Sequence, residues 1–270
     1  MEGRLSGIHR SPHRGASIEF AEHKEYTPGD EIRHIDWKAA AKSDKYYIKQ
    51  FEKESNLKVY FVIDASESMR YGSGARTKYE TAGYLTAALS YLFLVQADAV
   101  GLIVHGAETQ TYVPPRAAFS HLYPLCTALE EVEPQGTVGV AAGLERLSEL
   151  ARRREVAFVL SDLFDDADSV FQLLRRLRAR RLSVTLFHVL DPDELTFPFH
   201  KVTRFEGMES AQRVLAEPRM IRDAYLQELG RFLSETKHRC LENDISYQLV
   251  DCAVPVEVVV NRFLTGRGGG

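Results

Sequence analysis

The stretch that decides the fold is LKVYFVIDASES, residues 57–68. Residues 57–63 form a short, nearly continuous apolar run, which is typical of a β-strand buried on both faces of a sheet. The run ends at Asp64, and Ser66 and Ser68 follow at alternate positions. In an open parallel sheet, ligands bind beyond the carboxyl ends of the strands. The stretch therefore predicts a central strand that leads into a ligand-binding edge.

Working outward from this strand, apolar runs alternate with longer amphipathic or Ala/Leu-rich stretches. Strands are expected over 57–63, 99–104, 109–113, 155–161, 182–190 and 245–250, and helices over 77–97, 119–132, 140–153, 168–180 and 218–243. The strand over 109–113 is expected at a sheet edge, closed by Pro114 and Pro115. This alternation predicts an α/β fold with a mostly parallel, Rossmann-like sheet flanked by helices on both faces.

The pattern also suggests how the chain is divided. Residues 1–56 are interpreted as an N-terminal extension packed on the core of the domain that spans residues 57–262. Residues 191–217 lack strong periodicity and are expected to form a loop or a small hairpin inserted into that domain. The Gly-rich end, residues 263–270, is predicted to be a disordered tail.

Composition excludes several classes of function. The chain has 270 residues, a 44% hydrophobic fraction and a formal net charge of −4, so it has no overall basic field for a nucleic-acid partner. It contains no run near the roughly 18 apolar residues of a membrane helix, and its start does not resemble a signal peptide. The three cysteines form no CxxC pair. These features predict a cytoplasmic protein without a transmembrane segment in this chain.

Five oxygen-bearing side chains are expected to meet at one edge of the sheet. Asp64, Ser66 and Ser68 follow the first core strand, and Asp162 follows the fourth. Thr137 lies in the PQGT turn between these two segments. Two carboxylates with hydroxyls suit a hard cation rather than zinc, which prefers His and Cys. The expected ion is Mg²⁺, with Mn²⁺ or Ca²⁺ as alternatives.

This set resembles the metal-ion-dependent adhesion site (MIDAS) of von Willebrand factor A domains. That family has DxSxS after the first strand, a distant Thr, and an Asp after the fourth strand, and all five positions match here. The resemblance implies that Ser66 and Ser68 bind the metal directly and that Thr137 joins when a ligand docks. It also implies that Asp64 and Asp162 act directly or through water, and that an acidic residue of a partner completes the metal's shell.

A narrower resemblance covers nearly the whole chain. The segment IEFAEHKEYTPGDEIRHIDWKAAAKSDKYYIKQFEKE, residues 18–54, is similar to the bacterial domain-of-unknown-function family fifty-eight (DUF58). The matching residues are Glu19, Phe20, Tyr26, Pro28, Gly29, Asp30, Arg33, Ile35, Asp36 and Trp37. The sequence RFEGMES before the last long helix also fits. Two departures are the lack of N-terminal membrane helices and the Lys42-Ser43 pair, where the family usually has Arg-Thr or Arg-Ser.

The family resemblance implies a partner. Its members are commonly encoded beside MoxR-class AAA+ ATPases and other von Willebrand A proteins, which suggests an adaptor or chaperone-like role with such an ATPase. Trp37 is interpreted first as a packing anchor. The alternative is that Asp30, Arg33 and Trp37 together form a partner-binding surface.

An enzymatic function is not expected. Haloacid dehalogenase-type phosphatases need a second Asp two residues after the first, where this chain has Ser66. The chain also lacks a GxxxxGK[ST] phosphate loop and a GxSxG nucleophile elbow. The leading hypothesis is a metal-dependent protein-interaction module. The alternatives are a Mg²⁺-dependent phosphohydrolase that uses Asp64 and Asp162, and a metal-free scaffold in which the same residues cap a turn.

Overall fold

The structure is a computed structural model of the chain. It describes residues 18–25, 47–53, 57–106, 110–137, 139–164, 167–201, 203–206 and 213–266. The chain divides into two compact units, residues 1–56 and residues 57–270. The expected packing of residues 1–56 on the core stays a prediction.

Within the first unit, the described residues form an antiparallel pair of strands. Strand β1 (Ile18–Glu25) pairs with β2 (Tyr47–Lys53), so that Ile18 lies opposite Lys53 and Glu25 opposite Tyr47. The pairing shifts by one residue between Phe20 and Glu22, which marks a bulge.

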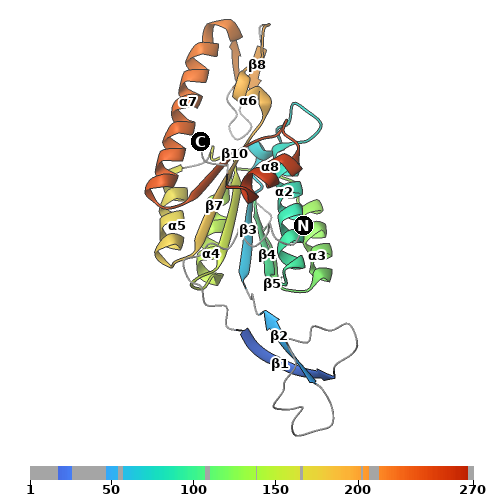
Figure 1. Cartoon of the computed structure of the whole chain (residues 1–270). Coiled ribbons are helices and arrows are strands. Elements are labelled where there is room, and N and C mark those ends of the chain that lie inside the picture. The colour runs from blue at the N-terminus through green and yellow to red at the C-terminus, as the bar shows by residue number, and fades with distance from the viewer. Residues whose placement is uncertain are drawn as a thin grey trace. The chain divides into compact units, whose positions relative to one another are not determined.

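The second unit is built on a six-stranded sheet, shown at the centre of Figure 1. The strand order is β10-β7-β6-β3-β4-β5, and only the β4–β5 pair is antiparallel. The bounds are β3 Lys58–Asp64, β4 Ala99–His105, β5 Gln110–Arg116, β6 Val156–Ser161, β7 Ser183–Leu190 and β10 Ser246–Asp251. This arrangement confirms the predicted α/β class and its mostly parallel sheet.

The alternation of side chains along β3 separates two hydrophobic cores. Val59, Phe61 and Ile63 face one core, and Tyr60 and Val62 face the other. Because both faces of the strand are covered, its sequence is apolar throughout instead of alternating with polar residues. The first core is covered by α2 Lys78–Val95, α3 Leu122–Glu130 and α8 Val256–Leu264, and the second by α4 Val140–Leu150, α5 Ala167–Ala179 and α7 Pro218–Glu242.

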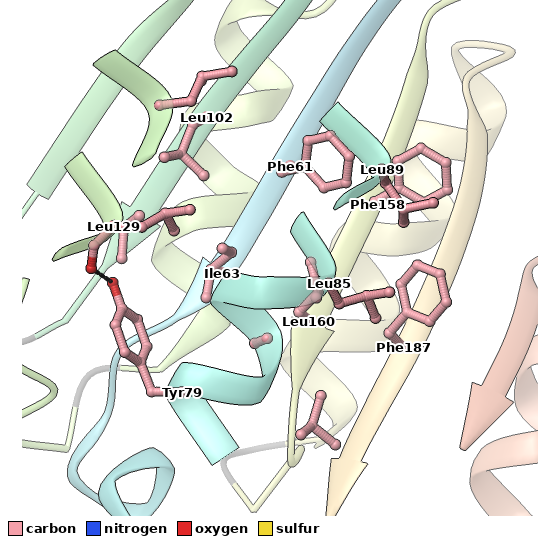
Figure 2. Packing of buried hydrophobic residues seen from close by; sticks show 14 of the residues in the cluster. Phe61, Ile63, Tyr79, Leu85, Leu89, Leu102, Leu129, Phe158, Leu160 and Phe187 are labelled. Carbon is pink, nitrogen blue, oxygen red and sulfur yellow. Dashed lines mark hydrogen bonds between the residues drawn. The ribbon is translucent and has the colours of Figure 1, made fainter. Parts of the chain in front are cut away.

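Aromatic rings fill the centre of the first core, as Figure 2 shows. Phe158 on β6 stacks between Phe61 and Phe187, with ring centroids 5.1 Å and 5.9 Å away. Tyr79 on α2 donates a hydrogen bond of 3.0 Å from its hydroxyl to the carbonyl oxygen of Leu129 on α3. This bond satisfies the hydroxyl of a buried side chain, and it ties the two helices together.

The structure differs from the expectation at the edge strand. β5 continues through Pro114 and Pro115 to Arg116 instead of ending before them. A proline lacks the N–H that a central strand needs, but among the described strands β5 has a neighbour on one side only. The two prolines are therefore accommodated by the position of β5 at the end of the sheet.

The expectation of a disordered end was also partly wrong. Helix α8 runs to Leu264, and Phe263 packs edge-on against Phe158 and Phe187 at centroid distances of 5.5 Å and 5.6 Å. These two residues therefore belong to the fold, because the ring of Phe263 covers the end of the aromatic core. Residues 267–270 lie outside the described part of the chain.

Residues 191–217 contain the expected hairpin, formed by β8 (Thr203–Glu206) and β9 (Arg213–Ala216). They also contain a short helix that the sequence analysis did not predict, α6 (Pro192–Thr196). Its N-cap is Asp191, whose backbone N–H donates a hydrogen bond to the Glu194 carboxylate in a capping box.

Candidate metal centre

The two aspartates predicted to bind metal lie at the same edge of the sheet. Asp64 is the last residue of β3, and Asp162 directly follows β6. β3 and β6 are parallel neighbours with Ile63 opposite Leu160, so their carboxyl ends coincide. Ser161 connects them, because its hydroxyl donates a hydrogen bond of 2.6 Å to Oδ2 of Asp64.

The DASES turn folds the two serines toward the same edge. The backbone N–H of Ser66 donates to Oδ1 of Asp64 at 2.9 Å, and the hydroxyl oxygens of Ser66 and Ser68 lie 3.1 Å apart. A short 3-10 helix, η3 (Glu67–Arg70), begins directly after Ser66. All three side chains are buried, so the alternate spacing of the motif places its polar groups together beneath the turn.

The segment that carries Thr137 is joined to this turn through the backbone. Gln135 N donates to the Ala65 carbonyl, and Glu67 N donates to the Gly136 carbonyl, each at 2.9 Å. Thr137 itself is exposed. The four residues Asp64, Ser66, Ser68 and Asp162 are thus buried at one edge, and Thr137 lies on the surface of the adjoining segment.

The Asp64 carboxylate lies in an unfavourable environment for a negative charge. Burial, and then the nearby charge of Asp162, raise the pKa of Asp64 to about 7. The hydrogen bonds from Ser161 and Ser66 oppose this rise only in part. Two buried carboxylates that repel one another would both be stabilised by a cation between or beside them.

A buried lysine, which the sequence analysis did not single out, lies at this edge. Lys78 is fully buried at the start of α2, and its Nζ lies 2.7 Å from Oδ2 of Asp162 and 2.6 Å from Oε1 of Glu194. The Nζ atom also lies 4.8 Å from the centre of the Phe164 ring. Burial lowers the pKa of Lys78, but the charges of Asp162 and Glu194 outweigh this effect and raise it. The ammonium is therefore charged.

One signal in the sequence could have drawn attention to Lys78. A lysine in the first turn of a helix opposes the helix dipole, which favours acidic side chains there. Thr77 and Glu80 form a capping box at the same helix start, so the position of the helix end is well defined. An unfavourably placed lysine at a defined helix start points to a carboxylate nearby in space, although the sequence does not say which one.

The turn after β7 borders the same region. The carboxylate of Asp191 accepts hydrogen bonds from the N–H and the hydroxyl of Ser73, at 2.9 Å and 2.5 Å. The hydroxyl of Tyr71 donates to Asp193 at 3.0 Å. The chain between η3 and α2 is thereby tied to the α6 turn, which carries Glu194.

His188 supports Asp162 from beneath without acting as a charged group. Its Nε2 lies 2.9 Å from the backbone oxygen of Asp162, and its Nδ1 lies 3.0 Å from the Tyr247 hydroxyl. Burial lowers the pKa of His188 to about 4, so the ring is neutral near pH 7. His188 is therefore a residue of the core edge.

The donor set at this edge fits a hard divalent cation. Asp64, Ser66, Ser68 and Asp162 offer only oxygen atoms, and the two carboxylates bring excess negative charge into a buried place. Among the described residues, no group of three or more His, Cys, Asp or Glu side chains is arranged to hold a metal ion. A metal here would therefore depend on the serine hydroxyls as well as on the carboxylates.

The predicted partner surface, Asp30, Arg33 and Trp37, lies outside the described residues. Its two interpretations, a packing anchor and a binding surface, both stay predictions.

Solved structures of other proteins resemble the fold of this chain. BatB of Bacteroides thetaiotaomicron superposes with a TM-score of 0.51 at 15% identity, over 78% of this chain and 98% of that chain. An aerotolerance-related membrane protein of Bacteroides fragilis has a TM-score of 0.49 at 18% identity, over 78% and 99%. The VWA domain of SpRpn10 has a TM-score of 0.39 at 17% identity, over 48% and 74%. At these identities the likeness concerns the fold alone, and the chain shares the α/β fold of BatB.

The family follows from the sequence. The family described as "Protein of unknown function DUF58" matches residues 22–231, and the chain belongs to this family. Its relatives include the uncharacterized proteins Rv1480 of Mycobacterium tuberculosis and Mb1516 of Mycobacterium bovis. Each is 27% identical over 202 residues, which are 73% of this chain and 63% of the relative. The chain thus spans less than two thirds of the length of these relatives.

Over the described part of the chain, no helix combines the length and the apolar character needed to cross a membrane.

Proposed function

We propose that the chain is a metal-dependent protein-interaction module. Asp64, Ser66, Ser68 and Asp162 would hold Mg²⁺, or else Mn²⁺ or Ca²⁺, and Thr137 would join when a partner docks. The observation that supports this most is the buried carboxylate pair, which lies with the serine hydroxyls at one sheet edge. The VWA-like fold itself indicates a protein-interaction module.

The proposed ligand is an acidic side chain of another protein. Asp64, Ser66, Ser68 and Asp162 are four ligand residues, fewer than the six oxygen ligands of an octahedral Mg²⁺ ion, so a carboxylate of a partner would complete the coordination shell. Thr137 is exposed beside the buried site, so it is accessible to a docking partner. The family resemblance suggests a MoxR-class AAA+ ATPase, or another von Willebrand A protein, as that partner.

Co-precipitation tests this function. The full chain is immobilised and incubated with a purified MoxR-class ATPase from the same genome, in millimolar Mg²⁺ or in EDTA. We expect recovery in Mg²⁺ that falls to background in EDTA and with Thr137→Ala. Thr265→Ala, at an exposed threonine after α8, is the matched control and should bind as the wild type does. If recovery of the ATPase is the same in EDTA and with Thr137→Ala as with the wild type in Mg²⁺, the binding is not mediated by metal.

We propose binding rather than catalysis at this site. The residue two positions after Asp64 is Ser66, which cannot act as a general acid near neutral pH. A phosphatase screen of wild type and Asp64→Ala tests this. Mg²⁺-dependent turnover by the wild type that disappears in Asp64→Ala would contradict a binding function and support the phosphohydrolase alternative.

A metal-free scaffold is the second candidate, and one observation favours it. Lys78 already places a positive charge on Asp162 from within the protein. In this alternative, the ammonium stabilises the edge of the sheet and no divalent cation is required.

A further inference from the structure

Lys78 is retained in the fold at a considerable cost in solvation. A buried ammonium group loses its hydration, and this loss is offset only by nearby opposite charges and hydrogen bonds. Two of its three N–H donors are accounted for by Asp162 and Glu194. The charge of Lys78 is therefore shared between a predicted metal ligand and a residue of the α6 turn.

The charges of Asp162 and of three charged groups near it, Asp64, Glu194 and Lys78, do not balance. Asp64, Asp162 and Glu194 are three carboxylates, and Lys78 is, among the described residues, the ammonium that contacts two of them. When all four are ionised, the group carries two negative charges in excess. This is the charge that one divalent cation would neutralise, so the internal ammonium does not by itself replace the metal.

Lys78 and a bound cation would share the same carboxylate. Oδ2 of Asp162 contacts the ammonium at 2.7 Å, and Oδ1 accepts a hydrogen bond of 3.2 Å from the backbone N–H of Phe164. A cation held by Asp162 would be repelled by Lys78 through a poorly solvated interior. Glu194 reduces this repulsion, because it draws the ammonium toward the α6 turn and neutralises part of its charge.

We propose that Lys78 is an internal counter-cation that lowers the affinity of this site for a divalent cation, and that Glu194 opposes it. The inference rests on the proposed metal site and adds the residues that set its affinity. The two residues form one ion pair, yet their removal has opposite consequences. Without Lys78 the site gains net negative charge, and without Glu194 it loses net negative charge.

The experiment measures Mn²⁺ affinity from the electron paramagnetic resonance signal of the free ion. It uses the full chain as wild type, Lys78→Met, Glu194→Gln, the double variant and Asp64→Ala. We expect Lys78→Met to bind Mn²⁺ on the order of tenfold tighter and Glu194→Gln on the order of tenfold weaker, since one unit charge at close range is worth at least one decade in affinity. The double variant restores the original net charge and should return toward the wild type.

A purely structural role for the ion pair would give a different result. Loss of either partner would then loosen the site, so both single variants would bind Mn²⁺ more weakly or equally well. That result would overturn the proposed role of Lys78. If the wild type still binds Mn²⁺ and Asp64→Ala abolishes the binding, the proposed metal site itself is supported. Lys78→Met alone leaves both Asp162 and Glu194 without their cationic partner and could misfold. In the double variant Glu194 is neutral, so only Asp162 lacks its partner, and this variant serves as the control for folding.

The remaining outcomes separate the two proposals. If the wild type shows no measurable binding while Lys78→Met binds Mn²⁺ through Asp64, then Lys78 has its proposed role and the metal-free scaffold becomes the native state. If neither the wild type nor any Lys78 variant binds Mn²⁺, both the role of Lys78 and the proposed metal-dependent function are overturned. Binding that survives Asp64→Ala lies elsewhere on the chain and also counts against both.

Discussion

The hydroxyl of Ser161 donates a 2.6 Å hydrogen bond to Oδ2 of Asp64, and so joins the ends of two neighbouring parallel strands. Ser161 is the last residue of β6, and its oxygen also accepts a 2.9 Å hydrogen bond from the backbone N–H of Leu163. One buried hydroxyl therefore satisfies a carboxylate and a backbone donor, and holds the chain on either side of Asp162.

Removal of this hydroxyl is expected to destabilise the protein. Ser161→Ala leaves the Leu163 N–H without a partner and takes one donor from Asp64, so the free energy of unfolding should fall by about 1–3 kcal/mol. Urea denaturation monitored by circular dichroism measures the change. Ser90→Ala is the matched control, because Ser90 is buried in α2 and its hydroxyl has no hydrogen-bond partner among the described residues. Equal losses in the two variants would show that the Ser161 bonds contribute nothing.

Metal binding should appear as a thermal shift that depends on Asp64. A ligand that binds only the folded state at ten times its dissociation constant adds about 1.4 kcal/mol of stability. For a domain of this size, that corresponds to a rise in Tm of roughly 3–6 °C. We expect the rise when wild type in EDTA is compared with wild type in excess Mg²⁺ or Mn²⁺, measured by scanning calorimetry.

The control for this shift is Asp64→Ala, which should melt at the same temperature in EDTA and in metal. A shift of equal size in the variant would place the bound ion at another part of the chain.

A glycine on α4 is expected to be required for the close packing of that helix on the sheet. A Cβ at Gly143 would lie 2.8 Å from Cγ1 of Val62 on β3. Gly143→Ala should therefore destabilise the protein by about 1–3 kcal/mol, even though alanine favours the helix by up to about 1 kcal/mol. Gly230→Ala on α7 has open space at its Cβ and should be stabilising by up to about 1 kcal/mol.

Opposite signs in chemical denaturation of the two glycine variants are the expected result. A stabilised Gly143→Ala would mean that β3 and α4 separate more easily than their packing indicates.

Helix α8 should contribute to stability through one aromatic side chain. Phe263→Ala removes a half-buried ring that packs against Phe158 and Phe187. Truncation of a fully buried Phe to Ala costs about 3–5 kcal/mol, so the free energy of unfolding should fall here by about 2–3 kcal/mol. Val258→Ala, on the exposed side of the same helix, should change it by less than about 0.5 kcal/mol. Thermal or urea unfolding distinguishes the two, and equal effects would mean that α8 does not pack on the core.

Much of the fold was accessible from the sequence because its elements carry strong local patterns. The apolar runs at β3 and β6 and the long helix α7 were all expected within a few residues of their bounds. The misses have local causes too. Pro114 and Pro115 are compatible with a strand only at a sheet edge, and α8 is too short and too close to the Gly-rich end to stand out.

The sequence by itself determined that Asp64 and Asp162 would lie at one edge of the sheet. Asp64 ends one buried strand and Asp162 follows another, and the carboxyl ends of parallel strands lie at the same edge of a sheet whatever the exact strand order. Only the tertiary structure decided that the Lys78 ammonium would lie between Asp162 and Glu194, which are 84 and 116 residues away along the chain. The physical reason is that hydrophobic periodicity acts over a few residues, whereas the partner of a buried charge depends on which strands become neighbours. The net charge around a cation bound at this edge therefore depends on residues that only the assembled sheet brings together.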